Sequence, residues 1–200
     1  MVGDEIMGNK SYIVKSIILI VSIISLGILV SYAYYNPLLL NKDSSQIIVT
    51  SDDVKLIYSN GSTISAKNIL PGWSAAKNFQ VNVESKKAFS YDINLVINSS
   101  NFYTSKADVN GFASSYLEYA LYECSGLGSG CSTLVTDYTL ISKNNGIVVT
   151  GSPNKANGTY YYQLVVRFTN NETKNQIQVG SDGKELSFDG YVTLSSSAKV

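Results

Sequence analysis

One uninterrupted apolar stretch near the N-terminus constrains this chain more than any other feature. Residues Ser16–Tyr35, SIILIVSIISLGILVSYAYY, contain no charged side chain, and about 20 apolar residues is the length that crosses a bilayer core as a helix. Lys10 and Lys15 precede the stretch, and no basic residue follows it before Lys42. Basic residues on one flank mark that flank as cytoplasmic. The pattern therefore predicts a short cytoplasmic N-terminus, 1–15, and export of everything beyond the stretch.

Two interpretations of the stretch stay open. In one it is an uncleaved transmembrane signal anchor, which would tether the exported part to the plasma membrane. In the other it is a secretory signal peptide, whose apolar region Ser16–Val30 is followed by Ser31-Tyr32-Ala33. Small residues at the −3 and −1 positions are what signal peptidase requires, so cleavage would fall between Ala33 and Tyr34. The chain is thereby divided into four parts: 1–15, the segment 16–35, a linker at 36–46 and an extracytoplasmic domain at 47–200.

The exported part has balanced charge and no histidine. Thirteen Lys+Arg and 13 Asp+Glu follow Asn36, because two of each kind precede it among the chain's 15 and 15. Nucleic-acid binding needs clustered positive charge, which this balance does not supply. Without histidine the chain lacks the usual general base, the commonest zinc ligand and every Ser-His-Asp or Cys-His arrangement. We expect a protein that is not an enzyme, with no cofactor, metal or nucleic-acid partner.

The exported part alternates apolar and polar residues in many short runs. Phe79, Val81 and Val83 alternate with polar neighbours, which is the period of a half-buried strand. The run 116–123 also fits a short helix, but its tyrosines favour a strand. The runs that predict strands are 46–50, 53–58, 79–84, 88–97, 116–123, 133–141, 146–150, 159–169 and 185–195.

Turn residues separate these runs. Pro71-Gly72 predicts a type II turn, and Asn60-Gly61 and Asn144-Asn145-Gly146 are further turn signals. Lys86-Lys87 is expected in a hairpin loop. About eight or nine short, evenly spaced strands predict an all-β fold, an antiparallel β-sandwich of jelly-roll or immunoglobulin-like topology, preceded by one N-terminal hydrophobic helix.

The two cysteines predict a structural disulfide. Cys124 and Cys131 enclose SGLGSG, and six small residues fold back easily enough to bring the sulfurs together across a hairpin. Both lie in the exported part, where thiols oxidise. A structural zinc site requires four Cys or His ligands, so no metal role is expected. The spacing of the two cysteines is not Cys-x-x-Cys, so no redox role is expected either.

Two other groups of residues are weaker candidates. Asp52-Asp53, Asp182 and Asp189 carry oxygens that calcium prefers, but their spacing is not that of an EF-hand, so solvated turns are the expected state. The tyrosines and Trp73 would suit a carbohydrate platform. The alternation of side chains along the predicted strands instead places most tyrosines on the side that faces the core.

Several features together resemble the TasA/camelysin group of exported Gram-positive proteins. The N-terminal signal ends in SYAYY, and an Ile69-Leu70-Pro71-Gly72 turn leads into FQVNV and YDINLVI. Near the C-terminus, YYYQLVVRFTNNETKNQIQVGSDGKELSFDGYVTL has the form of a strand, a polar segment, Lys-x-x-x-Phe-x-Gly and a final strand. The resemblance spans most of the chain.

This resemblance implies a jelly-roll sandwich that is exported and acts in a cell-surface fibre or biofilm matrix. Some members of the group have been called metallopeptidases, but without a histidine to bind zinc we do not expect that activity here. In such fibres an N-terminal segment freed by cleavage completes the sheet of a neighbour. Here that segment would be 36–50, with Ile47, Ile48 and Val49 as inserted residues. The alternative is a membrane-anchored extracellular binding module for a glycan, peptide or protein. The expected partners are the membrane, through 16–35 if uncleaved, further copies of the chain or other surface proteins.

Overall fold

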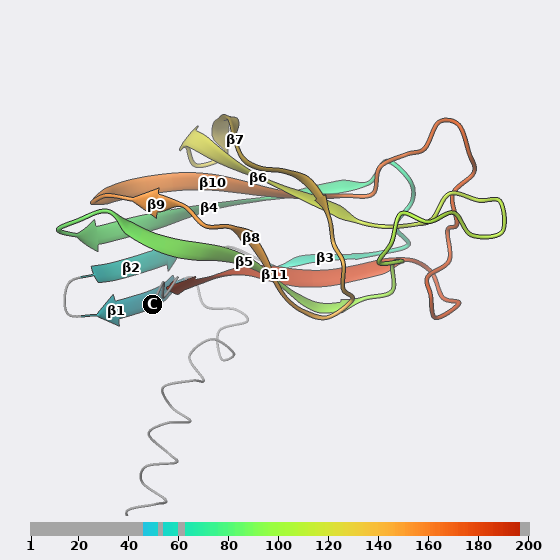
Figure 1. The fold of residues 1–200 in the computed structure, drawn as a ribbon, viewed down its shortest axis with the longest axis horizontal. Coiled ribbons are helices and arrows are strands. Elements are labelled where there is room, and N and C mark those ends of the chain that lie inside the picture. Colours follow the sequence, from blue (N-terminus) through green and yellow to red (C-terminus); the bar gives the residue numbers. More distant parts are fainter. Residues whose placement is uncertain (1–45, 52–53, 60–62, 197–200) are drawn as a thin grey trace, which may run out of the picture. The chain divides into compact units, whose positions relative to one another are not determined.

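The computed structural model describes residues 46–51, 54–59 and 63–196, all of which belong to one compact unit at 42–200. This part of the chain is all β, with no helix, and its strands form two antiparallel sheets packed together as a β-sandwich (Figure 1). The predicted fold class, an all-β antiparallel sandwich, is therefore confirmed for the described part of the chain. The expected N-terminal helix, the Ala33–Tyr34 cleavage point and the Asn60-Gly61 turn lie outside the described residues.

The first sheet, called sheet A, has six strands. In spatial order these are β1 (Gln46–Ser51), β2 (Val54–Ser59), β4 (Ser74–Ser85), β10 (Gly158–Arg167), β6 (Glu118–Gly126) and β7 (Ser129–Leu140). The second sheet, sheet B, runs in the order β3 (Ile64–Lys67), β11 (Ser187–Ser196), β5 (Phe89–Ser100) and β8 (Gly146–Gly151). The two-residue β9 (Asn154–Lys155) pairs with the beginning of β5.

The core forms where the alternating apolar faces of the two sheets meet. Its largest fully buried side chains include Tyr58, Phe79, Tyr91 and Tyr162. The Phe79 ring lies between those of Tyr58 and Tyr162, with centroid distances of 5.5 and 5.6 Å. The buried hydroxyls also find partners: Tyr91 and Tyr162 share a 2.8 Å hydrogen bond that joins β5 to β10 across the sandwich. This hydrogen bond between two tyrosine hydroxyls connects the two sheets within a mainly apolar core.

Fewer tyrosines are buried than the alternating pattern of the strands predicted. Of the described tyrosines, only Tyr58, Tyr91, Tyr119 and Tyr162 are buried, and the rest are partly exposed. The prediction that most tyrosines face the core was therefore wrong. The reason is that outward positions of sheet A also carry tyrosines, such as Tyr161, which stands opposite Cys124.

Lys86-Lys87 does not lie in a hairpin loop, contrary to expectation. The strands on either side, β4 and β5, belong to different sheets: β4 pairs with β2 and β10, and β5 pairs with β11 and β8. Each strand has one largely apolar face, and these faces are buried in the core between the two sheets when the connection crosses the sandwich. Pairing the strands edge to edge would instead put both apolar faces on one side of a single sheet.

The sequence patterns missed two short strands and the beginning of a long one. β3 and β9 are four and two residues long, too short to alternate visibly. β4 begins at Ser74, where Ala75 and Ala76 carry little hydrophobic signal. The turn before it was predicted correctly: Trp73 N–H donates to Leu70 O at 3.1 Å, and Gly72 adopts the positive φ of +90° that a type II turn requires.

Candidate functional site

The N-terminal strand β1 lies at the end of sheet A. Its only strand partner among the described residues is β2, and the register places Ile47 opposite Tyr58, Ile48 opposite Ile57 and Val49 opposite Leu56. Leu56 and Tyr58 are fully buried, so this end of the sheet contributes to the core. The predicted donor residues thus lie in a strand held by one neighbour.

Near β1, the edge of sheet B is only partly covered. β1 lies close to β11 (Figure 1). The short β3 pairs with β11 from Ser187 to Gly190. Over Thr193–Ser196, β5 is the strand with which β11 pairs in the described part of the chain. Among the described residues, β1 therefore lies at the end of its sheet and close to β11, and the end of a sheet is the position at which strand addition takes place.

The predicted disulfide closes the tip of the β6–β7 hairpin. Cys124 and Cys131 stand opposite each other, with their sulfurs 2.04 Å apart. The turn folds back toward sheet A, because a Cβ on Gly128 would lie 3.0 Å from Asn78 Nδ2 on β4. The disulfide therefore fixes a hairpin tip that leans over the outer face of its own sheet.

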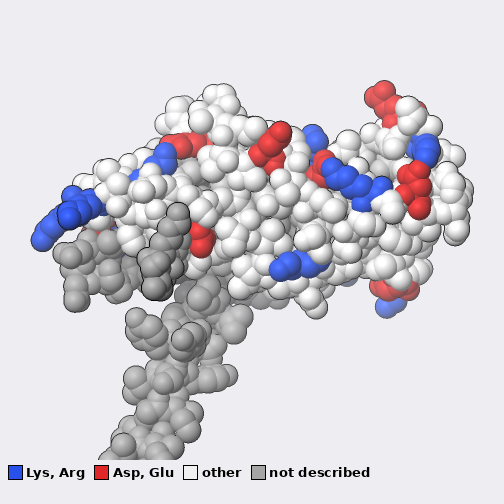
Figure 2. Space-filling view, viewed as in Figure 1, with Lys and Arg blue, Asp and Glu red and all other residues white. Residues whose placement is uncertain are grey.

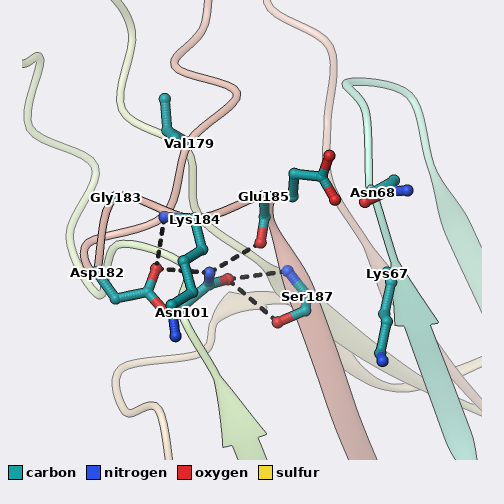
Figure 3. A pocket seen from close by; sticks show the side chains of 9 residues that line it. All are labelled: Lys67, Asn68, Asn101, Val179, Asp182, Gly183, Lys184, Glu185 and Ser187. Atoms are coloured by element: carbon teal, nitrogen blue, oxygen red, sulfur yellow. Dashed lines mark hydrogen bonds between the residues drawn. The ribbon is translucent and has the colours of Figure 1, made fainter.

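At the opposite end of β11, a hollow of about 510 Å³ lies above the side chain of Asn101 (Figure 3). The Asn101 amide donates to Asp182 Oδ1 at 2.8 Å and to Glu185 O at 2.9 Å. Its oxygen accepts the Ser187 N–H at 2.8 Å. Figure 3 shows these bonds holding the Asp182–Ser187 loop against the end of β5. The rim carries both Lys67 and Lys184 as well as carboxylates, so the hollow has no single sign of charge.

A second polar group occupies the outer face of sheet A. The Glu118 side chain is only 8% exposed and pairs with Lys106 at 2.9 Å and Arg167 at 3.1 Å, while Thr169 Oγ1 donates to it at 3.2 Å. The Arg167 guanidinium stacks 3.2 Å above the ring of Tyr138. Burial alone would raise the pKa of the Glu118 carboxyl, but these hydrogen bonds outweigh it and lower that pKa. All three donors thus bind one carboxylate, which connects β6 to Lys106 and to the end of β10.

Asp182 and Asp189, the two acidic residues considered for calcium that the structure describes, bind different partners. Asp182 binds Asn101, and the Lys184 N–H and the Asn101 amide lower the pKa of its carboxyl. Asp189 accepts a 2.7 Å bond from Asn98 instead, and Asp52-Asp53 lie outside the described residues. Within the described ranges no three His, Cys, Asp or Glu residues gather as metal ligands would.

Sequence reasoning missed both Asn101 and Glu118 as organising residues. Asn101 lies in a polar, irregular segment without periodicity, and its partners are more than 80 residues away. Glu118 lies in the run 116–123, which was predicted as a strand. No sequence signal indicated that Lys106 and Arg167 would cover it.

Charges of both signs are interspersed on the face in Figure 2, with no large patch of one sign. The residues described by the structure include no helix that is long and apolar enough to cross a membrane. Comparison with known proteins finds no family model that matches the chain and no curated protein similar to it.

Proposed function

We propose that this chain is a non-enzymatic, exported structural protein of a cell surface or extracellular matrix, of the kind that builds biofilm fibres. Copies join when the β1 strand of one replaces the β1 strand of the next. The observation that supports this most directly is the position of β1, at the end of sheet A with β2 as its only described strand partner. The loose resemblance to TasA/camelysin proteins points the same way.

Strand exchange of this kind loses few interactions. When β1 leaves its own sheet, the edge of β2 loses its pairing with this strand. A β1 from another copy restores the same six register pairs, from Gln46↔Ser59 to Ser51↔Val54. Because the replacement is identical in sequence, the exchanged contacts match those that were lost. The linker at 36–46 supplies the length of chain between subunits.

Export fits the same proposal. Cleavage after Ala33 would leave Tyr34 as the first residue, only a short distance in sequence from β1 at Gln46. A freed end of this kind can move to a neighbour, whereas a membrane anchor would hold it at the cell surface. The disulfide in the β6–β7 hairpin suits an oxidising extracytoplasmic environment.

A proline in β1 tests the proposal. Ile48→Pro removes one backbone N–H and fixes φ, so it weakens β1 as an inserted strand. Ile48→Val keeps strand propensity and is the matched control. We expect the proline variant to fold and stay monomeric in sedimentation, while the valine variant assembles like the native chain. Assembly of the proline variant to the native extent would contradict strand exchange.

A membrane-anchored binding module is the second candidate. The observation that favours it is the hollow above Asn101, with its amide, hydroxyl and charged groups. N-terminal sequencing of the protein from its native cells separates the two. A first residue at Tyr34 favours secretion and assembly, whereas an intact Met1–Tyr35 segment favours a tethered module.

A further inference from the structure

Strand β8 forms an edge of sheet B that is well suited to bind a further strand. In the described part of the chain its one partner in sheet B is β5. Its middle, Ile147-Val148-Val149-Thr150, is entirely β-branched and uncharged, and Ile147 and Val149 are 49% and 52% exposed. An uncharged, β-branched edge strand is a template on which strands of other chains add. A protein that carries such an edge is therefore expected to block it.

The backbone groups of Ile147 and Val149 point away from β5. Ile93 O on β5 accepts a 2.9 Å hydrogen bond from the hydroxyl of the β8 threonine, so Ile93 directs its backbone groups toward β8. Alternate residues of a strand direct these groups the same way, so Leu95 and its opposite residue Val148 form a hydrogen-bonded pair. Ile147 and Val149 flank Val148 and therefore direct their N–H and C=O groups to the outer edge, where a further strand would bind.

Side chains of other segments already bind both of these outward carbonyls. Lys143, in the turn before β8, donates from Nζ to Ile147 O at 2.8 Å. Tyr119, on β6 of sheet A, donates from its hydroxyl to Val149 O at 3.4 Å. An added strand would have to displace these donors before it could bind β8. It would also meet the charge of Lys143, and lysine is a residue that discourages pairing at a sheet edge.

The last residues of β8 lie against sheet A. Thr136 Oγ1 on β7 donates to Thr150 O at 2.5 Å. A Cβ on Gly151 would lie 2.6 Å from Leu121 Cδ2 and 3.3 Å from Val135 Cγ1. Glycine is the residue that allows so close an approach between backbone and neighbouring side chains. The two sheets therefore close against each other at this end of β8.

The adjacent edge of sheet A, strand β7, is irregular. It uses 12 residues where β6 uses nine, and its pairing with β6 shifts at three points. Each such bulge interrupts the regular row of backbone groups and twists the strand, which discourages the addition of another strand. At the opposite end of sheet A, β1 pairs with β2 through six consecutive positions without a shift. The edge of β2 that β1 occupies is thus a regular one.

We propose that the β7–β8 side of the sandwich is closed to strand addition, so that a second copy of this chain adds its strand at the β1 end of sheet A alone. Addition at the β1 end rests on the proposed function, whereas closure of the β7–β8 side stands without it. With one accepting edge per copy, the joined subunits form an unbranched filament. A second accepting edge at β8 would let such filaments pair side by side.

Removal of two of the closing groups from the exported protein, in an Ile48→Pro background, tests the closure. Lys143→Met keeps most of the side-chain stem, Thr136→Val keeps the side-chain shape, and each removes a hydrogen-bond donor. We expect this triple variant, in sedimentation velocity, to associate at a protein concentration about tenfold lower than Ile48→Pro alone, because the freed β8 carbonyls can accept bonds from another chain. Lys87→Met with Thr104→Val, at two exposed positions outside β7 and β8, is the matched control in the same background and should not change association.

Hydrogen exchange shows where the copies meet. In the associated triple variant we expect slowed exchange at the amides of Ile147 and Val149, because these amides point to the outer edge. Association equal to that of the control would overturn the closure, and so would association that leaves the β8 amides unprotected.

Electron microscopy of Lys143→Met, Thr136→Val in the native background separates the two proposals. We expect fibres that pair side by side, whereas the native chain forms single ones. Fibres that stay single would overturn the closure. A chain that forms no fibres with or without the substitutions would contradict the proposed function, and the comparison in the proline background would still decide the closure.

Urea denaturation checks that each variant is folded before its association is compared. If Thr136→Val prevents folding, Lys143→Met alone decides, because Lys143 is exposed and lies outside the strands. We expect Lys143→Met to associate at a lower protein concentration than Lys87→Met. Equal behaviour of these two variants would overturn the closure.

Discussion

Glu118 is an example of a single residue whose charge is stabilised by contacts from distant parts of the chain. Lys106 lies before β6, whereas Arg167 and Thr169 lie at and just beyond the end of β10, and all three donate to one carboxylate. Burial disfavours the charge of Glu118, but the three donors outweigh it, so the pKa of the carboxyl is lower in the folded than in the unfolded chain. Part of the folding stability therefore depends on pH.

The sign of this dependence can be tested with Glu118→Gln. A depressed carboxyl pKa stabilises the fold above the ordinary value of 4.5 and loses that contribution as pH falls through the lower folded value. The glutamine variant should lose about 1–3 kcal/mol of unfolding free energy at pH 7. It should also lose less stability than the native chain below pH 4.5. Urea denaturation at several pH values measures both effects.

Glu84→Gln is the control for this prediction. Glu84 pairs with Lys55 at 3.3 Å, but both side chains are more than 40% exposed. Solvent screens such a pair, so its loss should cost about 0.5 kcal/mol or less. Similar losses of unfolding free energy for the two variants would mean that the buried ion pairs of Glu118 stabilise the fold no more than the exposed pair of Glu84.

Asn101 is the second residue whose role depends on distant contacts. Asn101→Ala removes two donated bonds and leaves the Ser187 N–H without its acceptor. We expect a loss of about 2–3 kcal/mol in unfolding free energy, measured by urea denaturation. Asn98→Ala removes one exposed bond to Asp189 and should cost much less. Equal costs would show that the Asp182–Ser187 loop does not depend on Asn101.

At the scale of strands, the local sequence pattern predicted where most strands lie, but it did not predict which strands pair with one another. The runs around Phe79, Ile93 and Leu164 were correctly predicted as strands, because alternation is a local consequence of the pleat. The assignment of β4 and β5 to opposite sheets was not predictable, since it depends on which apolar faces meet in space. The hydrogen-bond partners of Asn101 and Glu118 were not predictable either, because they too depend on which segments meet in space.

The disulfide contributes at this scale, because it fixes one hairpin. Replacing both Cys124 and Cys131 by serine should lower the unfolding free energy by about 2–3 kcal/mol, since the unfolded chain regains the freedom of the closed loop. Thermal or urea unfolding measures the loss, and the native protein under reducing conditions should show a similar one. Two alkylatable thiols in the exported protein would contradict a structural disulfide.

At the scale of the whole molecule, the arrangement suits a repeating unit. A β-sandwich with tyrosine hydroxyls bonded across its core provides a stable body. In the proposed assembly, the terminal strand β1, with its one described strand partner, would join one copy to the next. The apolar segment 16–35 was expected to determine whether the β-sandwich domain is secreted or anchored in the membrane. Its interpretation as a signal peptide or an anchor stays a prediction.

Electron microscopy of the exported chain that begins at Tyr34, purified and concentrated, tests the proposed assembly most directly. We expect regular fibres whose formation requires β1, because each copy offers one strand and one vacated edge. A protein with a processed N-terminus that stays strictly monomeric at high concentration would contradict the proposal.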